Sequence, residues 1–281
     1  MLRRYLEKSG QFKVVAVDTT HVGRDAFLRL QPSPISLQLV VQAMSGAVLL
    51  TSQLKDAGTL SLKFQGDGPM QHITVEANSQ GQTRGYCGDI HCDFAPSEAG
   101  LFETAIGAGT LTYRWRSSRT NQIHTSVVPL VAGEMAPNLT HYLLQSDQIP
   151  SALSLGAVLD PDKGVKGSGG ILIQALPGAD PNVMVILEDR LANLPPLGSF
   201  FGQAPGFSGM EKILFENLDV ELLHEQAVSY HCSCSRERIL KILASLEEND
   251  ISGGEEGVTV HCSFCTKPYH FSQDEIRLLN S

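Results

Sequence analysis

Hydrophobic and polar residues change their spacing near residue 59, and this change separates a long helix from a series of strands. Over residues 34–54 apolar side chains recur three or four positions apart, which predicts a helix that buries most of one side. Ser33 suits the N-cap of this helix, and Pro34 suits its first turn. Over residues 60–64 apolar and polar side chains alternate, and a Gly-Asp-Gly-Pro turn follows at 66–69, so a β-hairpin is expected next.

Strand-like runs continue beyond this turn, with one helical stretch among them at residues 139–145. These runs are short, rich in β-branched or large apolar residues, and bounded by turn residues. They cover residues 14–17, 73–75, 111–115, 123–128, 153–159 and 171–176. The order of the elements predicts an α+β fold, in which residues 1–178 form a mixed, largely antiparallel sheet domain with helices.

The composition changes after Pro177-Gly178, and residues 179–231 form a second region. Helices are expected at 183–194 and 210–223, separated by a loop rich in glycine and proline. Helices of this length gain little stability alone and have to dock on another surface. Periodicity alone favours an ordinary packed helical subdomain, and the alternative is a metastable helical linker that folds conditionally.

The last region, residues 232–281, contains two close cysteine pairs. Cys232 and Cys234 form a C-x-C pair, and after 27 intervening residues Cys262 and Cys265 form a C-x-x-C pair. Two such pairs supply the four thiolates of a tetrahedral Zn²⁺ site. A region this small has few large apolar residues, so a bound metal is expected to stabilise it. The sequence therefore predicts a small C-terminal domain with one Zn²⁺ per chain.

The cysteine spacing leaves two roles for this site open. A closed, inert four-cysteine site is the commoner role, and a redox switch is the alternative. Four cysteine ligands leave no position for water, which argues against hydrolytic chemistry. The histidines are scattered and no nucleophile motif such as G-x-S-x-G occurs, so we expect no enzyme activity. Cys87 and Cys92 form a looser pair without further ligands, which favours buried or incidental thiols.

The net charge of −9 is concentrated after residue 178. Residues 1–178 carry no net charge, residues 179–231 carry −6, and residues 232–281 carry −3. Nucleic-acid binding needs basic side chains that neutralise phosphates, so the acidic zinc module disfavours that partner. The first residues lack the apolar segment of a signal peptide, and no apolar run reaches the roughly 20 residues of a membrane span. A cytoplasmic protein without membrane contact is expected, and in that reducing compartment cysteines suit metal binding.

Several motifs resemble those of the heat-shock-protein-33 (Hsp33) family of redox-regulated chaperones, across nearly the whole chain. The most specific matches are Cys232-Ser-Cys234-Ser-Arg-Glu-Arg, His261-Cys262-Ser-Phe-Cys265 and Tyr269-His270-Phe271. Upstream, the family's N-terminal domain is matched by Gln65-Gly66-Asp67-Gly68-Pro69-Met70, by Arg84-Gly85, and by Gly169-Gly170 leading into Gln174 and Pro177. Cys87 and Cys92 depart from the family's four-cysteine set.

The resemblance implies an ATP-independent holdase chaperone that is inactive while it is reduced and bound to zinc. Under oxidative stress Cys232 would pair with Cys234 and Cys262 with Cys265, zinc would be released, and the linker at 179–231 would unfold. The activated form would be a homodimer that binds unfolding client proteins.

A second function stays open from the residues alone. It is a static zinc-ribbon interaction module on an α+β domain, with another protein or nucleic acid as its partner. For a chaperone, Phe200, Phe201 and Phe207 are candidate client contacts, because three aromatic residues lie in one glycine- and proline-rich loop. Packing against the N-terminal domain explains these phenylalanines at least as well.

Overall fold

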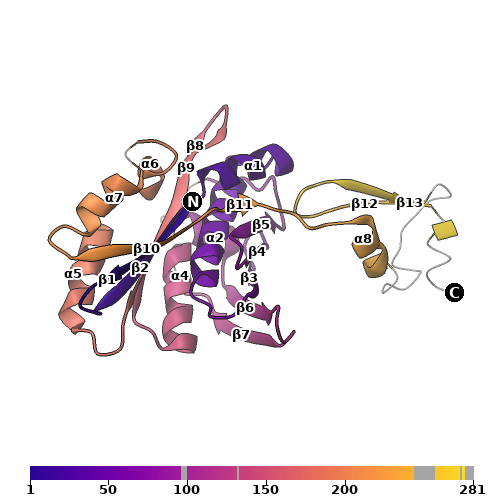
Figure 1. The fold of residues 1–281 in the computed structure, drawn as a ribbon. Coiled ribbons are helices and arrows are strands. Elements are labelled where there is room, and N and C mark those ends of the chain that lie inside the picture. Colours follow the sequence, from indigo (N-terminus) through magenta and orange to yellow (C-terminus); the bar gives the residue numbers. More distant parts are fainter. Residues whose placement is uncertain (96–99, 132, 205, 244–256, 273, 276–281) are drawn as a thin grey trace. The chain divides into compact units, whose positions relative to one another are not determined.

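The computed structural model describes residues 1–95, 100–131, 133–204, 206–243, 257–272 and 274–275. The chain divides into two compact units, Met1–Tyr230 and His231–Ser281. Figure 1 shows the elements of both units. Residues on both sides of position 178 belong to the first unit. The domain boundary predicted at that position is therefore not tested by this division and stays a prediction.

An antiparallel five-stranded sheet forms one layer of the first unit. Its order is β10 (Val220–Gln226), β1 (Leu2–Glu7), β2 (Phe12–Asp18), β9 (Gly164–Ala175) and β8 (Ser151–Asp160). The central pair, β2 and β9, keeps a regular register over its whole length. Irregular pairing occurs near the outside, at Arg4 and Tyr5 in β1 and at Val158 and Leu159 in β8.

A second sheet has six strands. Its order is β11 (Ser229–Tyr230), β5 (Gln82–Cys87), β4 (His72–Asn78), β3 (Gly58–Gly66), β6 (Gly109–Ser117) and β7 (Ile123–Pro129). All neighbours are antiparallel except β11, which runs parallel to β5. In β3 and β4 every second side chain is buried, as the alternation in the sequence predicts. The α+β fold with largely antiparallel sheets is confirmed.

Helix α2 (Pro34–Thr51) contacts strands of both sheets and forms the centre of the core. The predicted cap is confirmed, because the Ser33 hydroxyl accepts a hydrogen bond from the Ser36 amide at 3.2 Å. The expectation that one side of the helix is buried was too narrow, since fourteen of its eighteen residues are buried. The helix is long and apolar enough to span a membrane, but 78% of its apolar window is buried, so it is a core helix.

Four shorter helical elements complete this part of the unit: α1 (Thr20–Leu30), α3 (Leu101–Ile106), α4 (Met135–Tyr142) and the π-helical turn Leu143–Asp147. The last two confirm the helical stretch expected at residues 139–145. The first two were not predicted from the sequence, although their buried residues recur at helical spacing, at Val22, Ala26 and Leu30 in α1 and at Phe102, Ala105 and Ile106 in α3.

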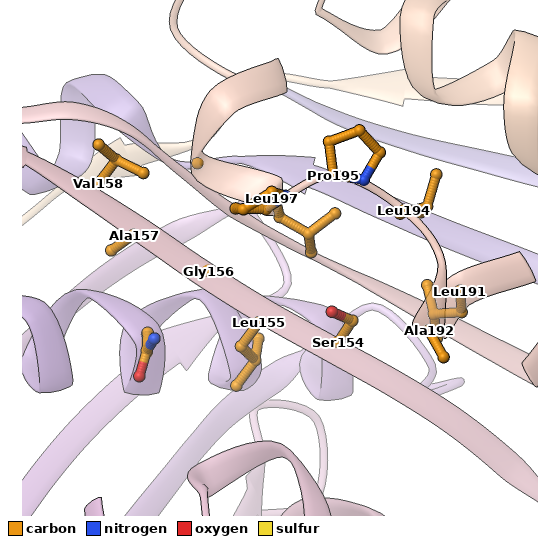
Figure 2. Close-up of a pocket in the computed structure, with 13 residues that line it drawn as sticks. Ser154, Leu155, Gly156, Ala157, Val158, Leu191, Ala192, Leu194, Pro195 and Leu197 are labelled. Atoms are coloured by element: carbon orange, nitrogen blue, oxygen red, sulfur yellow. The ribbon is translucent and has the colours of Figure 1, made fainter. Parts of the chain in front are cut away.

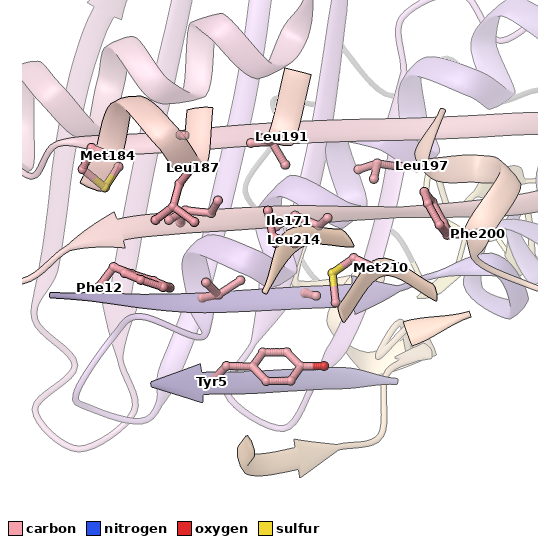
Figure 3. Close-up of a cluster of buried hydrophobic side chains, with 14 of the residues drawn as sticks. Tyr5, Phe12, Ile171, Met184, Leu187, Leu191, Leu197, Phe200, Met210 and Leu214 are labelled. Carbon is pink, nitrogen blue, oxygen red and sulfur yellow. The ribbon is translucent and has the colours of Figure 1, made fainter. Parts of the chain in front are cut away.

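Residues 181–214 pack helices against the five-stranded sheet: α5 (Pro181–Ala192), α6 (Leu197–Phe200) and α7 (Phe207–Leu214). Figure 3 shows Met184, Leu187, Met210 and Leu214 from these helices against strand residues such as Phe12. The helices therefore share one apolar cluster with the sheet.

The helix predicted over residues 210–223 is wrong beyond Leu214. Asn217 takes a left-handed backbone conformation with φ of 58°, which ends helical geometry, and β10 follows. Apolar residues at 214, 218 and 222 fit helical spacing equally well, so the pattern alone misleads. Pairing with the edge of β1 makes this segment a strand and not a helix, because β10 pairs with β1 from Leu2 to Glu7.

The described residues of the second unit include α8 (Arg236–Leu243) and a hairpin of β12 (Val258–His261) and β13 (Pro268–Phe271). Its apolar cluster has four buried members in the described residues: Ile239, Leu243, Tyr269 and Phe271. A core of this size gives little folding free energy by itself.

Candidate metal centre

Two turns of the second unit carry the four cysteines predicted as ligands. Cys232 and Cys234 lie just before α8, which begins after Ser235; the Ser235 hydroxyl accepts a hydrogen bond from the Arg238 amide at 3.2 Å. Cys262 and Cys265 lie in the turn between β12 and β13. In that turn the Cys262 carbonyl accepts hydrogen bonds from the amides of Cys265 at 3.3 Å and Thr266 at 2.8 Å. The turn thus brings the thiols of Cys262 and Cys265 from one short loop into the four-cysteine group.

The four sulfur atoms lie within 4.8 Å of one another. The Sγ atoms of Cys232 and Cys262 are 3.7 Å apart, and those of Cys234 and Cys265 are 3.4 Å apart. Four sulfurs at about 2.3 Å from a tetrahedral Zn²⁺ would be about 3.8 Å from each other. The donor set and its spacing therefore fit a metal ion held by four thiolates. Among the described residues, these cysteines are the one group of three or more potential ligands that converges in this way.

Hydrogen bonds and burial give the thiols of Cys234, Cys262 and Cys265 different acidities. Burial raises the pKa of Cys234, but hydrogen bonds from Tyr269 and the neighbouring thiols outweigh it and lower the pKa to about 7. Burial raises the pKa of Cys262, and it raises the pKa of Cys265 to about 12. One thiolate is thus available near neutral pH before a metal binds, and thiolates are the form that binds metals.

Two side chains that sequence reasoning did not assign support the cysteine turns. The Tyr269 hydroxyl lies 3.2 Å from the Sγ atom of Cys234 and 3.3 Å from its carbonyl oxygen. Arg236 donates to the His270 carbonyl at 2.6 Å, pairs with Glu275 at 2.6 Å, and stacks over the Phe271 ring at 4.4 Å. These contacts join residues more than thirty positions apart, so no local sequence pattern indicates them.

Cys87 and Cys92 are buried in the first unit, with 6% and 3% of their surfaces exposed. Cys87 donates to the Asp89 carbonyl at 3.4 Å, and the Cys92 amide donates to the same oxygen at 3.4 Å. Burial raises the pKa of Cys87 to about 11 and also raises that of Cys92. They belong to no metal-capable group in the described part of the chain, which agrees with the expectation of buried thiols.

The three phenylalanines considered as client contacts pack inside the first unit. Phe200 and Phe201 are buried, and Phe207 packs against the same apolar cluster. The rings of Phe201 and Phe207 meet edge to face with centroids 5.2 Å apart. Packing therefore accounts for these residues in this conformation.

The comparisons with known proteins agree along the whole chain. The family described as Hsp33 protein matches residues 1–272. The chain belongs to the Hsp33 family. It is 32% identical over 281 residues to the 33 kDa chaperonin of Desulforamulus reducens, covering 98% of this chain and 95% of that protein. It is 35% identical over 291 residues to the 33 kDa chaperonin of Thermus thermophilus, covering 98% and 85%.

The Hsp33 fold is also found in a solved structure. The crystal structure of the 33 kDa chaperonin from Thermotoga maritima matches with a TM-score of 0.85 and 27% identity, covering 99% of this chain and 97% of that chain. Hsp33 is a family of chaperones and not of enzymes, so membership confirms the expectation that no enzyme activity is present. The chain is an Hsp33 chaperonin with a C-terminal group of four cysteines able to hold a metal ion.

Proposed function

We propose that this Hsp33 family member is a redox-controlled, ATP-independent holdase of the cytoplasm. In the reduced form Cys232, Cys234, Cys262 and Cys265 would hold one Zn²⁺, and the protein would be inactive. The observation that carries the proposal is the group of four sulfurs within 4.8 Å, in a unit whose described residues include few buried apolar side chains. Such a unit depends strongly on the state of those sulfurs.

Oxidation would convert the four thiols into two disulfides. Each disulfide forms when two thiols release two protons and two electrons, and one hydrogen peroxide molecule accepts them to give two water molecules. Family resemblance pairs Cys232 with Cys234 and Cys262 with Cys265. The two sulfur contacts of 3.7 and 3.4 Å instead join one cysteine from each pair, so peptide mapping of the oxidised protein is needed to test the pairing.

Loss of the thiolates would destabilise the second unit. A zinc ion bound by four thiolates supplies on the order of 10 kcal/mol or more of folding free energy. Disulfide sulfurs no longer serve as thiolate ligands, so that free energy is lost on oxidation. The four buried apolar side chains among the described residues of this unit cannot replace it.

The linker at residues 179–231 would respond to this loss. Its helices are held by one apolar cluster on the five-stranded sheet and are short, so they cannot persist without docking. Release of the linker would expose that cluster to unfolding client proteins, and the activated protein would act as a homodimer. The segment is thus the bistable element that the redox state biases.

Light scattering from a heat-unfolding client protein tests the proposal. The reduced, zinc-loaded protein should not suppress aggregation, and the protein treated with peroxide at elevated temperature should. A variant with Cys232→Ser and Cys234→Ser should lose both tight zinc binding and redox control. A control with Cys87→Ser and Cys92→Ser should keep both, because these thiols lie outside the four-cysteine group.

Two results would contradict the proposal. Equal suppression by the reduced and oxidised proteins would remove redox control. Unchanged zinc affinity and unchanged activation in the variant lacking Cys232 and Cys234 would refute the ligand assignment.

A further inference from the structure

Strand β8 is an edge strand without the features that normally prevent an edge from pairing. Over residues 151–159 it carries no charged residue and no proline, and its irregular pairing begins only after Val158. The other edges of the two large sheets differ from it: β10 carries Glu221 and Glu225, β11 has two residues, and β7 is three residues shorter than β8 and ends in Pro129. Long, uncharged edges readily accept another strand. In the described part of the chain, β8 pairs with β9 alone.

The hydrogen-bond pattern shows which backbone groups of β8 are directed outward. The Ala175 amide donates to the Pro150 carbonyl at 3.1 Å, which makes these two residues a hydrogen-bonded pair. Such pairs alternate along an antiparallel ladder. In the observed register, the even-numbered residues of β8 bond to β9, and Ser151, Leu153, Leu155 and Ala157 direct their N–H and C=O groups away from it.

A groove follows this edge. One cavity of about 490 Å³ lies along Ser151–Ser154, with Pro137, His141 and Leu144 on one wall and Glu188, Leu191 and Ala192 on the other. A second cavity of about 270 Å³ continues along Ser154–Val158, and Figure 2 shows Leu194, Pro195 and Leu197 beside that part of the strand. The two cavities share Ser154, Leu191 and Ala192. Together they span eight residues of β8, which is about 26 Å of strand.

The lining of the groove indicates what it can bind. Glu188 is its one acidic residue and His141 its one imidazole, and the other side chains are apolar or neutral. Outward backbone groups at every second residue match the backbone of an extended polypeptide, whose apolar side chains would enter the cavities. A second copy of this chain fits less well, because its own α4 would flank its β8 and meet the wall that α4 forms in the first copy.

We propose that the β8 groove binds an extended, uncharged and largely apolar segment of an unfolding client protein, added to the sheet as a strand beside β8. This inference rests on the proposed holdase function. One wall, residues 188–197, belongs to the linker, so release of the linker would open the groove along its whole length. Strand β8 itself lies outside the linker and would remain paired with β9.

Proline substitution tests the backbone contacts. Ala157→Pro removes an outward N–H group without removing a bond to β9, and edge strands tolerate proline at such positions. The probe is fluorescently labelled, reduced and carboxymethylated α-lactalbumin, a permanently unfolded protein. Its affinity for the oxidised full-length variant should fall about tenfold, measured by fluorescence anisotropy. Val127→Pro is the matched control, because Val127 has the same outward position on edge strand β7 and should leave the affinity unchanged.

Hydrogen exchange in the oxidised wild-type protein tests the same contacts without a substitution. Addition of the probe should slow exchange at the amides of Leu153, Leu155 and Ala157, and should leave β7 unaffected. Failure of the oxidised protein to bind the probe at all would refute the holdase function and this inference with it. Binding with unchanged exchange in β8 would refute the groove alone. Protection in β8 that needs no probe and rises with protein concentration would assign the edge to a second copy and also overturn the proposal.

Discussion

Replacement of Phe201 by alanine should release the linker without oxidation. Phe201 has no exposed surface, and its ring lies against the backbone of β9: a Cβ atom added at Gly169 would be 2.5 Å from Phe201 Cδ2. The ring also contacts Phe207 edge to face at 5.2 Å. Truncation would therefore leave a cavity between the linker and the sheet, where neither neighbour can easily close in.

The expected magnitude follows from the burial. Phe→Ala substitutions at fully buried sites cost about 3–5 kcal/mol. Because about 1.4 kcal/mol corresponds to a tenfold change in an equilibrium constant, the ratio of undocked to docked linker should rise by roughly two to four powers of ten. The reduced, zinc-loaded Phe201→Ala protein should then be cut by protease within residues 181–214 and should suppress aggregation of a heat-unfolding client.

Val185→Ala is the matched control on the same segment. Val185 lies on α5 and is 64% exposed, so its truncation should change stability by no more than about 0.5 kcal/mol. Denaturant unfolding of the two variants measures the difference. If Phe201→Ala were as stable and as protease-resistant as Val185→Ala, the packing argument would be refuted. If it lost stability but held no client while reduced, linker release would not be the activating step.

Three further predictions concern other parts of the molecule. Glu211→Ala should weaken linker docking by about 1.5–3 kcal/mol, measured by denaturant unfolding, because Glu211 accepts hydrogen bonds from Arg3 at 2.8 Å and Tyr5 at 2.6 Å. Removal of metal by a chelator under reducing conditions should increase hydrogen exchange throughout residues 231–243 and leave the core helix α2 protected. Cys87 in the reduced native protein should react slowly with iodoacetamide at neutral pH, and faster as pH rises toward its pKa of about 11, since the thiolate is the reactive form; mass spectrometry after timed quenching checks this.

The sequence predicted an element well where its pattern of apolar and polar residues fits only one type of secondary structure. Alternation at residues 60–64 allows only a strand with one buried face, and β3 has that pattern. Ser33 and Pro34 mark the start of α2 because capping chemistry is local. The depth of burial of α2 was not predictable, because it depends on a second sheet whose position is a tertiary property.

Prediction failed where the sequence pattern fits both a helix and a strand, and pairing with a distant strand decides between them. Residues 220–226 have leucines that suit a helix, yet they pair with β1. The convergence of the four cysteines was predictable from their spacing alone, since ribbon-type zinc sites take their ligands from two close pairs. The contact between Tyr269 and Cys234 was not predictable from the sequence, because it depends on how β13 lies against the residues around Cys234.

The end of the linker offers a route by which a change at the cysteines would reach the whole segment. Strand β10 pairs with the five-stranded sheet, and three residues after it β11 pairs with the six-stranded sheet. The connection is held by Gln226, which donates to the Ser79 carbonyl at 2.8 Å, and by Arg29, whose guanidinium lies 5.3 Å from the Tyr230 ring. Cys232 follows two residues later, so loss of structure in the cysteine unit would act first on the two-residue strand β11, the shortest pairing in either large sheet. Once β11 is released, β10 would lose its fixed end, and the helices before it would be held by their apolar contacts and by polar contacts such as those of Glu211 with Arg3 and Tyr5.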